Sequence, residues 1–180
     1  MKIQIIYTSL TGCTRRVAQA VYSGLSAENK SIHDLQDGIP QLDGDIILLG
    51  YWGVRGGPCK EMQEFLKTVS GKAVGVFCTL GYYADSGHAR DTLESGINLL
   101  KGRNQVIGGF VCNGAVSQSL KEGQGIDGTA VPTQQKELRW EMVQNHPTAA
   151  ECNLAAERFE ERIQLYSRCK ELQIPFQSIL

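Results

Sequence analysis

Four hydroxyl side chains gather around a single glycine near the start of the chain. The segment reads Thr8-Ser9-Leu10-Thr11-Gly12-Cys13-Thr14. An apolar, β-branched run precedes it at residues 2–7, and apolar residues at helical spacing follow it as far as Leu25. Free backbone N–H groups at the start of a helix hold phosphate well, and hydroxyl groups add further donors. The pattern therefore predicts a strand, a phosphate-binding turn and a helix.

Other phosphate-binding loops do not fit this first segment. In nucleoside triphosphatases the loop continues from its second glycine to a lysine and a hydroxyl residue, and Gly12 has no such continuation. The dinucleotide fingerprint needs three glycines, and only Gly12 is present. A cysteine phosphatase would carry an arginine six positions after its cysteine, but Gln19 stands six positions after Cys13. A polar strand-to-helix turn without a ligand remains the alternative.

Two later segments rich in glycine and aromatic residues also follow buried strands. The second segment, 51–58, comes after an apolar run at 45–50, and the third segment, 79–88, comes after an apolar run at 72–78. Ligands of open α/β sheets bind beyond the carboxyl ends of the strands, near the point where the strand order reverses. The three segments are therefore expected to meet around one ligand.

Strands and helices alternate along the rest of the chain. Besides the three apolar runs, a weak polar strand is expected at 31–35 and a fifth strand at 104–112. Strong helical patterns begin after Pro58, near His88 and at Thr148. The alternation predicts a doubly wound α/β fold, with a five-stranded parallel sheet in the order 2-1-3-4-5 and helices on both faces. In that order the strands that carry the three segments are neighbours.

One polar stretch interrupts this pattern. The 180 residues suit a single domain over 1–180, with a surface insertion at about 115–147. The 115–147 segment contains three glycines and only a weak helical pattern near 134–143. A connection of this length in a compact domain is usually functional or mobile. We expect it to govern access to the ligand or contact with a partner.

Composition and charge exclude several classes of function. The formal net charge of −1 indicates neither nucleic acid nor a membrane surface as a partner, and no apolar run is long enough to span a bilayer. Without a visible signal peptide, a cytoplasmic location with free thiols is expected. The six cysteines show neither a C-x-x-C pair nor metal-site spacing, so no metal is predicted. No Ser-His-Asp set or carboxylate pair indicates dedicated catalytic residues.

The first segment closely resembles the flavodoxin phosphate loop. That loop reads aromatic, any residue, Ser or Thr, two spacers, a small residue, any residue and Thr, with Ala four positions later. The matching positions here are Tyr7, Ser9, Gly12, Thr14 and Ala18. The other two segments resemble those of small flavodoxin-like proteins, which carry Tyr-Trp with Arg-Gly, and Thr-Leu-Gly-x-Tyr-Pro-Asp-Ser-x-His-Ala. This chain departs from them at Ala84, where they have proline, and it is less acidic than classical flavodoxins.

The resemblance implies FMN as the cofactor, with its phosphate on the first segment and its isoalloxazine ring between the other two. Trp52 is expected to stack on the ring, with Tyr82 or Tyr83 near the opposite face or edge. Cys13 is expected to be a loop spacer, and His88 to lie at a helix start. The cofactor-binding residues implied are Thr8, Ser9, Leu10, Thr11, Gly12, Cys13, Thr14, Tyr51, Trp52, Gly53, Val54, Arg55, Gly56, Thr79, Leu80, Gly81, Tyr82, Tyr83, Asp85 and His88.

Three functions are compatible with this interpretation. The first is an electron-transfer protein that shuttles electrons between redox partner proteins, a reductase as donor and an enzyme as acceptor. The second is an FMN-dependent NAD(P)H:quinone or small-substrate oxidoreductase, in which the 115–147 segment would form a wall of the substrate pocket. The third is a binding or regulatory module that keeps the fold without the flavin. The intact first segment favours the first two.

Overall fold

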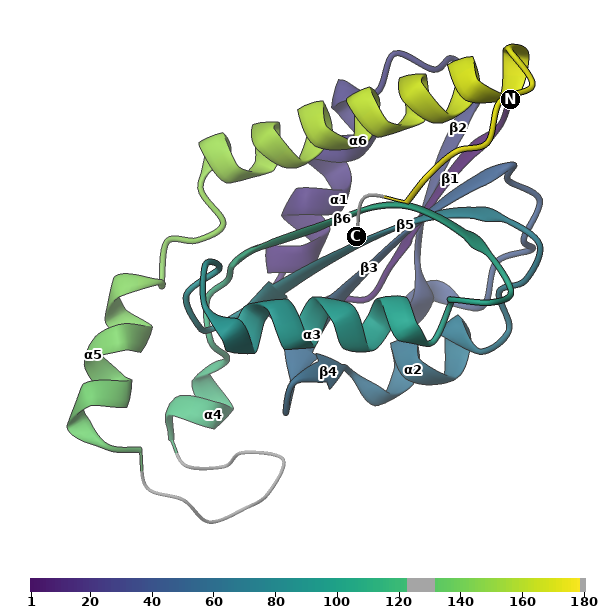
Figure 1. Cartoon of the computed structure of the whole chain (residues 1–180). Coiled ribbons are helices and arrows are strands. Elements are labelled where there is room, and N and C mark those ends of the chain that lie inside the picture. The colour runs from purple at the N-terminus through teal and green to yellow at the C-terminus, as the bar shows by residue number, and fades with distance from the viewer. Residues whose placement is uncertain (123–131, 179–180) are drawn as a thin grey trace.

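A parallel sheet forms the centre of the molecule (Figure 1). The computed structural model describes residues 1–122 and 132–178. Its main strands lie in the order β2-β1-β3-β5-β6 and comprise β1 (Ile3–Tyr7), β2 (Lys30–Asp34), β3 (Ile46–Val54), β5 (Ala73–Leu80) and β6 (Gln105–Asn113). All four contacts between neighbours in this order are parallel. The strand order expected from the sequence is confirmed, and the polar β2 forms one edge.

Helices cover both faces of the sheet. One face carries α1 (Cys13–Gly24) and α6 (Ala149–Glu171), and the other carries α2 (Lys60–Leu66) and α3 (Gly87–Asn98). A short 3-10 turn, Leu35–Asp37, takes the place of a helix between β2 and β3. Successive strand residues point to opposite faces. Ile5 therefore belongs to the core cluster that contains residues of α1 and α6, whereas Ile6 belongs to the cluster that contains residues of α2 and α3.

The second segment differs from the expected open loop. β3 continues as far as Val54 and pairs antiparallel with a sixth strand, β4 (Gly57–Pro58). The turn between them consists of Arg55 and Gly56, which have φ angles of 51° and 77°. Positive φ at both central residues is typical of the type I′ turn, whose twist matches that of a two-stranded hairpin. The segment is thus a hairpin at the end of a sheet strand.

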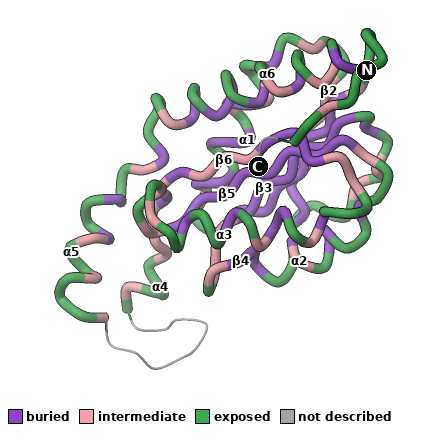
Figure 2. Tube along the Cα trace, viewed as in Figure 1, coloured by how far each residue is buried: buried purple, intermediate pink, exposed green. Residues whose placement is uncertain are grey.

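The 115–147 segment lies beyond the carboxyl end of β6 and carries α4 (Gln118–Lys121) and α5 (Gln134–Met142) (Figure 1). The weak helical pattern near 134–143 is therefore confirmed by α5. Both helices are largely exposed (Figure 2), although the side chains of Trp140 and Val143 are buried. The two ends of the segment meet, since the Ala115 N–H donates to the carbonyl of His146 at 3.2 Å.

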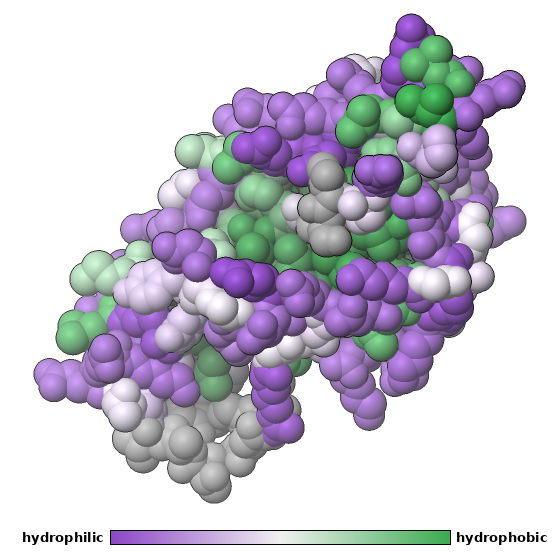
Figure 3. Space-filling view, in the orientation of Figure 1, coloured by the Kyte–Doolittle hydropathy of each residue, from purple (hydrophilic) through white to green (hydrophobic). Residues whose placement is uncertain are grey.

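The surface in the view of Figure 3 is mainly hydrophilic, and hydrophobic residues gather on it between α6 and α3. None of the helices in the described part of the chain is long and apolar enough to cross a membrane.

A substitution in α3 tests how closely that helix packs on β3. Tyr51 is fully buried against Gly96, and a methyl group at this glycine would collide with the Tyr51 hydroxyl. Gly96→Ala should lower the free energy of unfolding by about 1–3 kcal/mol, the usual cost of overpacking a core. Gly87→Ala in the same helix is the control, because nothing lies within 4 Å of the added methyl group. Equal urea midpoints for the two variants would contradict the tight packing.

Candidate functional site

The first segment forms a helix start with free backbone donors. Gly12 adopts φ 83°, a left-handed conformation that glycine reaches without strain, and α1 begins at the next residue. The N-cap residue, Gly12, offers no side-chain cap to this helix. Among the described residues, the backbone N–H groups of 9–14 have no hydrogen-bond acceptor. Such a helix start attracts anions through its N–H groups and its dipole.

The hydroxyl groups of this segment shape it as well as offering donors. Thr8 uses both of its donors within the protein: its N–H bonds to the Gly50 carbonyl at 3.0 Å, and its Oγ1 donates to Glu61 at 2.6 Å. Both hydrogens that Thr8 can donate are therefore already used within the protein, and Glu61 is a supporting residue that the sequence analysis missed. Ser9 Oγ accepts from the Arg15 N–H at 3.3 Å, which leaves its own hydrogen free to donate.

Two further hydroxyls link the first segment to its surroundings. The Oγ1 atoms of Thr14 and Thr79 lie 3.0 Å apart, so the first and third segments are directly joined. Thr11 is exposed, and its Oγ1 donates to the Ala115 carbonyl at 3.2 Å. Leu10 beside it is 56% exposed at the tip of the segment. Only Thr11 and Leu10 therefore present much side-chain surface to solvent here.

The two aromatic residues of the second segment face different environments. The Tyr51 side chain is fully buried and donates its hydroxyl hydrogen to the Thr92 carbonyl at 2.8 Å, and burial raises its pKa well above the usual value. Its side chain is therefore enclosed by the protein rather than exposed at the surface. Trp52 and Val54 are partly exposed while packing against the core cluster under α2 and α3. Gly53 lies against Thr92 and Leu80, with no room for a side chain.

Aromatic rings cluster in the third segment. The ring of Tyr82 meets Tyr83 and His88 edge to face, with centroid distances of 5.7 and 5.4 Å. Tyr83 is 49% exposed, and Asp85 and His88 are also exposed. Ser86 caps α3 by accepting from the Ala89 N–H at 3.1 Å, so His88 lies at a helix start, as expected.

The second and third segments lie next to each other. A Cβ atom placed on Gly56 would lie 3.9 Å from Cε1 of His88, so the β3–β4 turn and the start of α3 adjoin. Together with the bond between Thr14 and Thr79, this places all three segments at the carboxyl ends of the neighbouring strands β1, β3 and β5. That is the position where open α/β sheets bind ligands.

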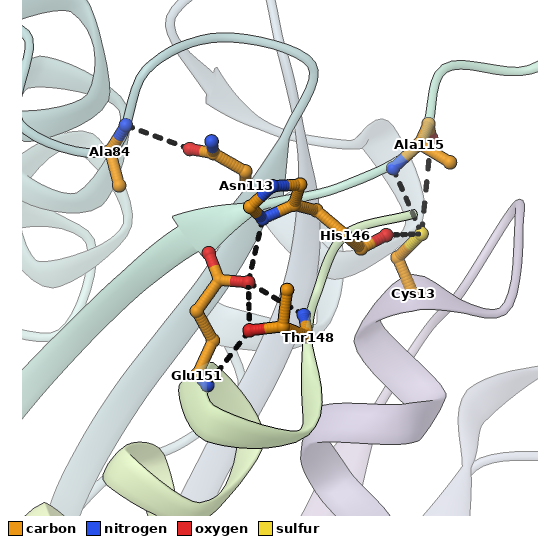
Figure 4. A network of polar contacts seen from close by, with 7 residues as sticks. All are labelled: Cys13, Ala84, Asn113, Ala115, His146, Thr148 and Glu151. Atoms are coloured by element: carbon orange, nitrogen blue, oxygen red, sulfur yellow. Dashed lines mark hydrogen bonds and ion pairs between the residues drawn. The ribbon is translucent and has the colours of Figure 1, made fainter. Parts of the chain in front are cut away.

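Figure 4 shows how both ends of the 115–147 segment contact this region. The Cys13 sulfur accepts from the Ala115 N–H at 3.2 Å and donates to the His146 carbonyl at 3.4 Å. On the other side of this network, Asn113 accepts from the Ala84 N–H at 2.9 Å and so fixes the third segment. The Cys13 sulfur therefore joins the first segment to both ends of the 115–147 segment. The role of Asn113 was missed by the sequence analysis.

Burial disfavours the thiolate form at two of the remaining cysteines. All six cysteines are free and buried. Burial raises the pKa of Cys59 to about 11 and that of Cys78 to about 12, so both thiols are neutral near pH 7. In residues 1–122 and 132–178 no group of three or more His, Cys, Asp or Glu residues could bind a metal ion.

Glu151 fixes the end of the 115–147 segment, and its lowered pKa predicts how the stability of the protein depends on pH. Partial burial alone would raise the pKa of Glu151, but hydrogen bonds from Thr148 and from His146 (2.7 Å) outweigh burial and lower it. The pKa of the Glu151 carboxyl group is therefore lower in the folded protein than in the unfolded chain. The stabilisation is present when the pH is above the unfolded-state pKa, and it is lost as the pH falls through the folded-state pKa.

Glu151→Gln should therefore cost about 0.5–2 kcal/mol of stability at pH 7, the usual range for a helix cap. The loss should shrink in acid, below both pKa values of the carboxyl group. Urea unfolding of the cofactor-free protein across pH measures both effects. Glu161→Gln, which breaks an exposed pair with Arg158 on the same helix, is the control. A loss at Glu151 that is equal at every pH would contradict this account.

Comparisons with known proteins agree with the fold. A family model described as a flavodoxin domain matches residues 4–160. The flavodoxin-like domain-containing protein BilS of Clostridioides difficile (strain CD3) is 30% identical over 124 residues, which cover 67% of this chain and 70% of that protein.

Two solved structures show the same architecture. Oxidised flavodoxin 2 from Bacillus cereus matches with a TM-score of 0.56 at 18% identity, covering 90% of this chain and 99% of that one. The Fusobacterium nucleatum flavodoxin, solved bound to flavin mononucleotide, matches with a TM-score of 0.54 at 15% identity, covering 93% of this chain and 97% of that one. At these identities the likeness concerns the fold.

Proposed function

Because the chain belongs to the flavodoxin family, we propose that it binds FMN and transfers electrons between redox partner proteins. The observation that carries this proposal is the uncapped start of α1, where the N–H groups of 9–14 lack acceptors among the described residues. A terminal phosphate would supply the acceptors that these donors lack. FMN, when bound, supplies the redox chemistry, and the protein supplies binding, orientation and electrostatics.

The three segments would divide the work of binding. The backbone of the first segment, with the hydroxyls of Ser9, Thr11 and Thr14, would hold the phosphate. Trp52 is the partly exposed aromatic residue of the second segment, and it would cover one face of the ring. The third segment would supply the opposite wall through Tyr82 or Tyr83. Thr8 and Tyr51 would act indirectly, by fixing the backbone of their segments.

The alternative is an FMN-dependent NAD(P)H:quinone or small-substrate oxidoreductase. The two proposals differ in what the protein does when it is given NAD(P)H and a quinone. An electron carrier should turn over slowly with these small molecules and exchange electrons rapidly with a reductase. An oxidoreductase should show saturable turnover without any partner protein. Either result requires FMN to copurify or to rebind, so a chain that takes up no FMN would overturn both.

Replacing 117–145 by a short glycine-serine linker tests the role of the 115–147 segment. The ends of the segment are already joined by the 3.2 Å bond between Ala115 and His146, so the linker need not strain the fold. We expect a folded protein that binds FMN and exchanges electrons more slowly with an NADPH-dependent flavodoxin reductase. The measurement is stopped-flow reduction of the bound flavin.

A milder variant distinguishes the effect of the exposed surface of α5 from an effect on folding, in the same assay. Leu138 and Met142 are 50% and 69% exposed on α5, so the double substitution to serine should leave the fold intact. If α5 contacts a partner, this variant should slow the exchange as well. A linker variant that does not fold, or one that exchanges electrons at the original rate, would argue against the proposal that the segment serves partner contact rather than the fold.

A further inference from the structure

A cation from α5 lies on the aromatic cluster of the third segment. The guanidinium carbon of Arg139 is 4.2 Å from the ring centroid of Tyr82. Nε of Arg139 is buried and has no hydrogen-bond acceptor in the part of the chain that the structure describes. The arginine is therefore held by the face of the tyrosine ring. A cation over an aromatic face within about 6 Å is attracted by the ring quadrupole, and more strongly when water is excluded.

Tyr82 also contacts two other rings of the third segment. Its ring packs edge to face against both Tyr83 and His88. The backbone on either side of Tyr82 is held by two other contacts. Val116 packs against Gly81, and the side-chain oxygen of Asn113 accepts a hydrogen bond from the Ala84 N–H. The third segment thus rests on residues that come from the end of β6 and from the 115–147 segment.

We propose that Arg139 is a positioning residue for the flavin ring, and that it acts by holding Tyr82 and, through it, the third segment. The inference rests on the proposed function. A wall that is already ordered before the ligand arrives loses less conformational entropy on binding. The proposal assigns α5 a part in building the cofactor site, separate from any contact that its exposed face makes with a partner.

The first test uses the cofactor-free protein, so it does not depend on FMN. Arg139→Met removes the cation and keeps much of the side-chain bulk. We expect the amide hydrogens of 81–88 to exchange severalfold faster in this variant. Lys136→Met is the matched control, because the ammonium group of Lys136 lies 5.1 Å from the ring of Trp140 on the same helix. It should leave exchange at 81–88 unchanged.

The second test compares two flavins. We propose that Arg139 acts near the isoalloxazine ring, which both flavins share. Arg139→Met should therefore weaken the binding of FMN and of riboflavin by a similar factor, about 2- to 30-fold. Arg139→Lys keeps the charge but loses the planar stack, so it should give an intermediate loss. Tyr82→Leu should abolish any further effect of Arg139→Met, since the two residues act as one unit.

The outcomes separate the inference from the proposed function. The inference is supported if Arg139→Met speeds amide hydrogen exchange at 81–88 and lowers the affinity for both flavins equally. Unchanged hydrogen exchange, or a loss of affinity for FMN alone, would overturn it. A wild-type protein that binds neither flavin would overturn the proposed function, and the exchange experiment would still decide whether Arg139 orders the third segment.

Discussion

FMN should bind the cofactor-free protein at least roughly 100-fold more tightly than riboflavin. The two ligands differ only in the phosphate, and hydrogen bonds to a charged group contribute about 1.5–3 kcal/mol each. The uncapped start of α1 offers several such donors at 9–14. Isothermal titration of the same preparation with each ligand measures the difference. Riboflavin binding as tight as FMN binding would contradict a phosphate site in the first segment.

Single substitutions divide this difference among the hydroxyls. Thr11→Ala and Thr14→Ala should each weaken FMN binding by about 1–3 kcal/mol, the range for removing a partner from a charged group. Thr11 is exposed and Thr14 is fully buried against Thr79, so Thr14→Ala should cost stability as well. Riboflavin is the internal control: its affinity should be unaffected in Thr11→Ala because it lacks the phosphate.

The second large effect is expected at Trp52. The side chain is partly exposed at the end of β3, in the segment that we propose lies beside the ring. Aromatic stacking contributes about 0.5–1.5 kcal/mol beyond area burial. An electron-rich ring also disfavours the negative charge of the reduced flavin. Trp52→Ala should therefore weaken binding, raise the midpoint potential of the bound flavin and relieve the quenching of its fluorescence.

Trp52→Phe separates stacking from packing. Phenylalanine keeps an aromatic face. The midpoint potential and the fluorescence quenching of the flavin bound to Trp52→Phe should therefore lie between those of the wild type and of Trp52→Ala. The readouts are flavin fluorescence and equilibrium redox titration with a reference dye. If Trp52→Ala changes neither, then Trp52 serves only the core cluster against which it packs.

Periodicity made the framework predictable. The apolar runs and their spacing were enough to place the parallel strands in order, because a buried parallel strand and an amphipathic helix have distinct patterns. The capping box at Thr148 and Glu151 was also readable from the sequence and is present. The phosphate-loop resemblance identified residues that the fold brings to one edge of the sheet.

The contacts that tie the segments together were not predictable. The β3–β4 hairpin was missed because its turn is Arg55-Gly56, without the Asn-Gly or Asp-Gly that usually marks a type I′ turn. The adjacent Tyr51 and Trp52 look equivalent in the sequence, and only the packing of α3 shows that Tyr51 is buried. The bond from Thr8 to Glu61 joins residues far apart in the chain, which no local pattern reveals.

An anaerobic reductive titration of the purified, FMN-loaded protein, followed by its reaction with NADPH and a quinone, tests the central claim most directly. The account predicts one FMN per chain, reversible reduction by dithionite, rapid reduction by NADPH when a flavodoxin reductase is added, and negligible turnover without it. A protein that takes up no FMN, or one that rapidly turns over NADPH and quinone without a reductase, would contradict the claim that it is an FMN electron carrier.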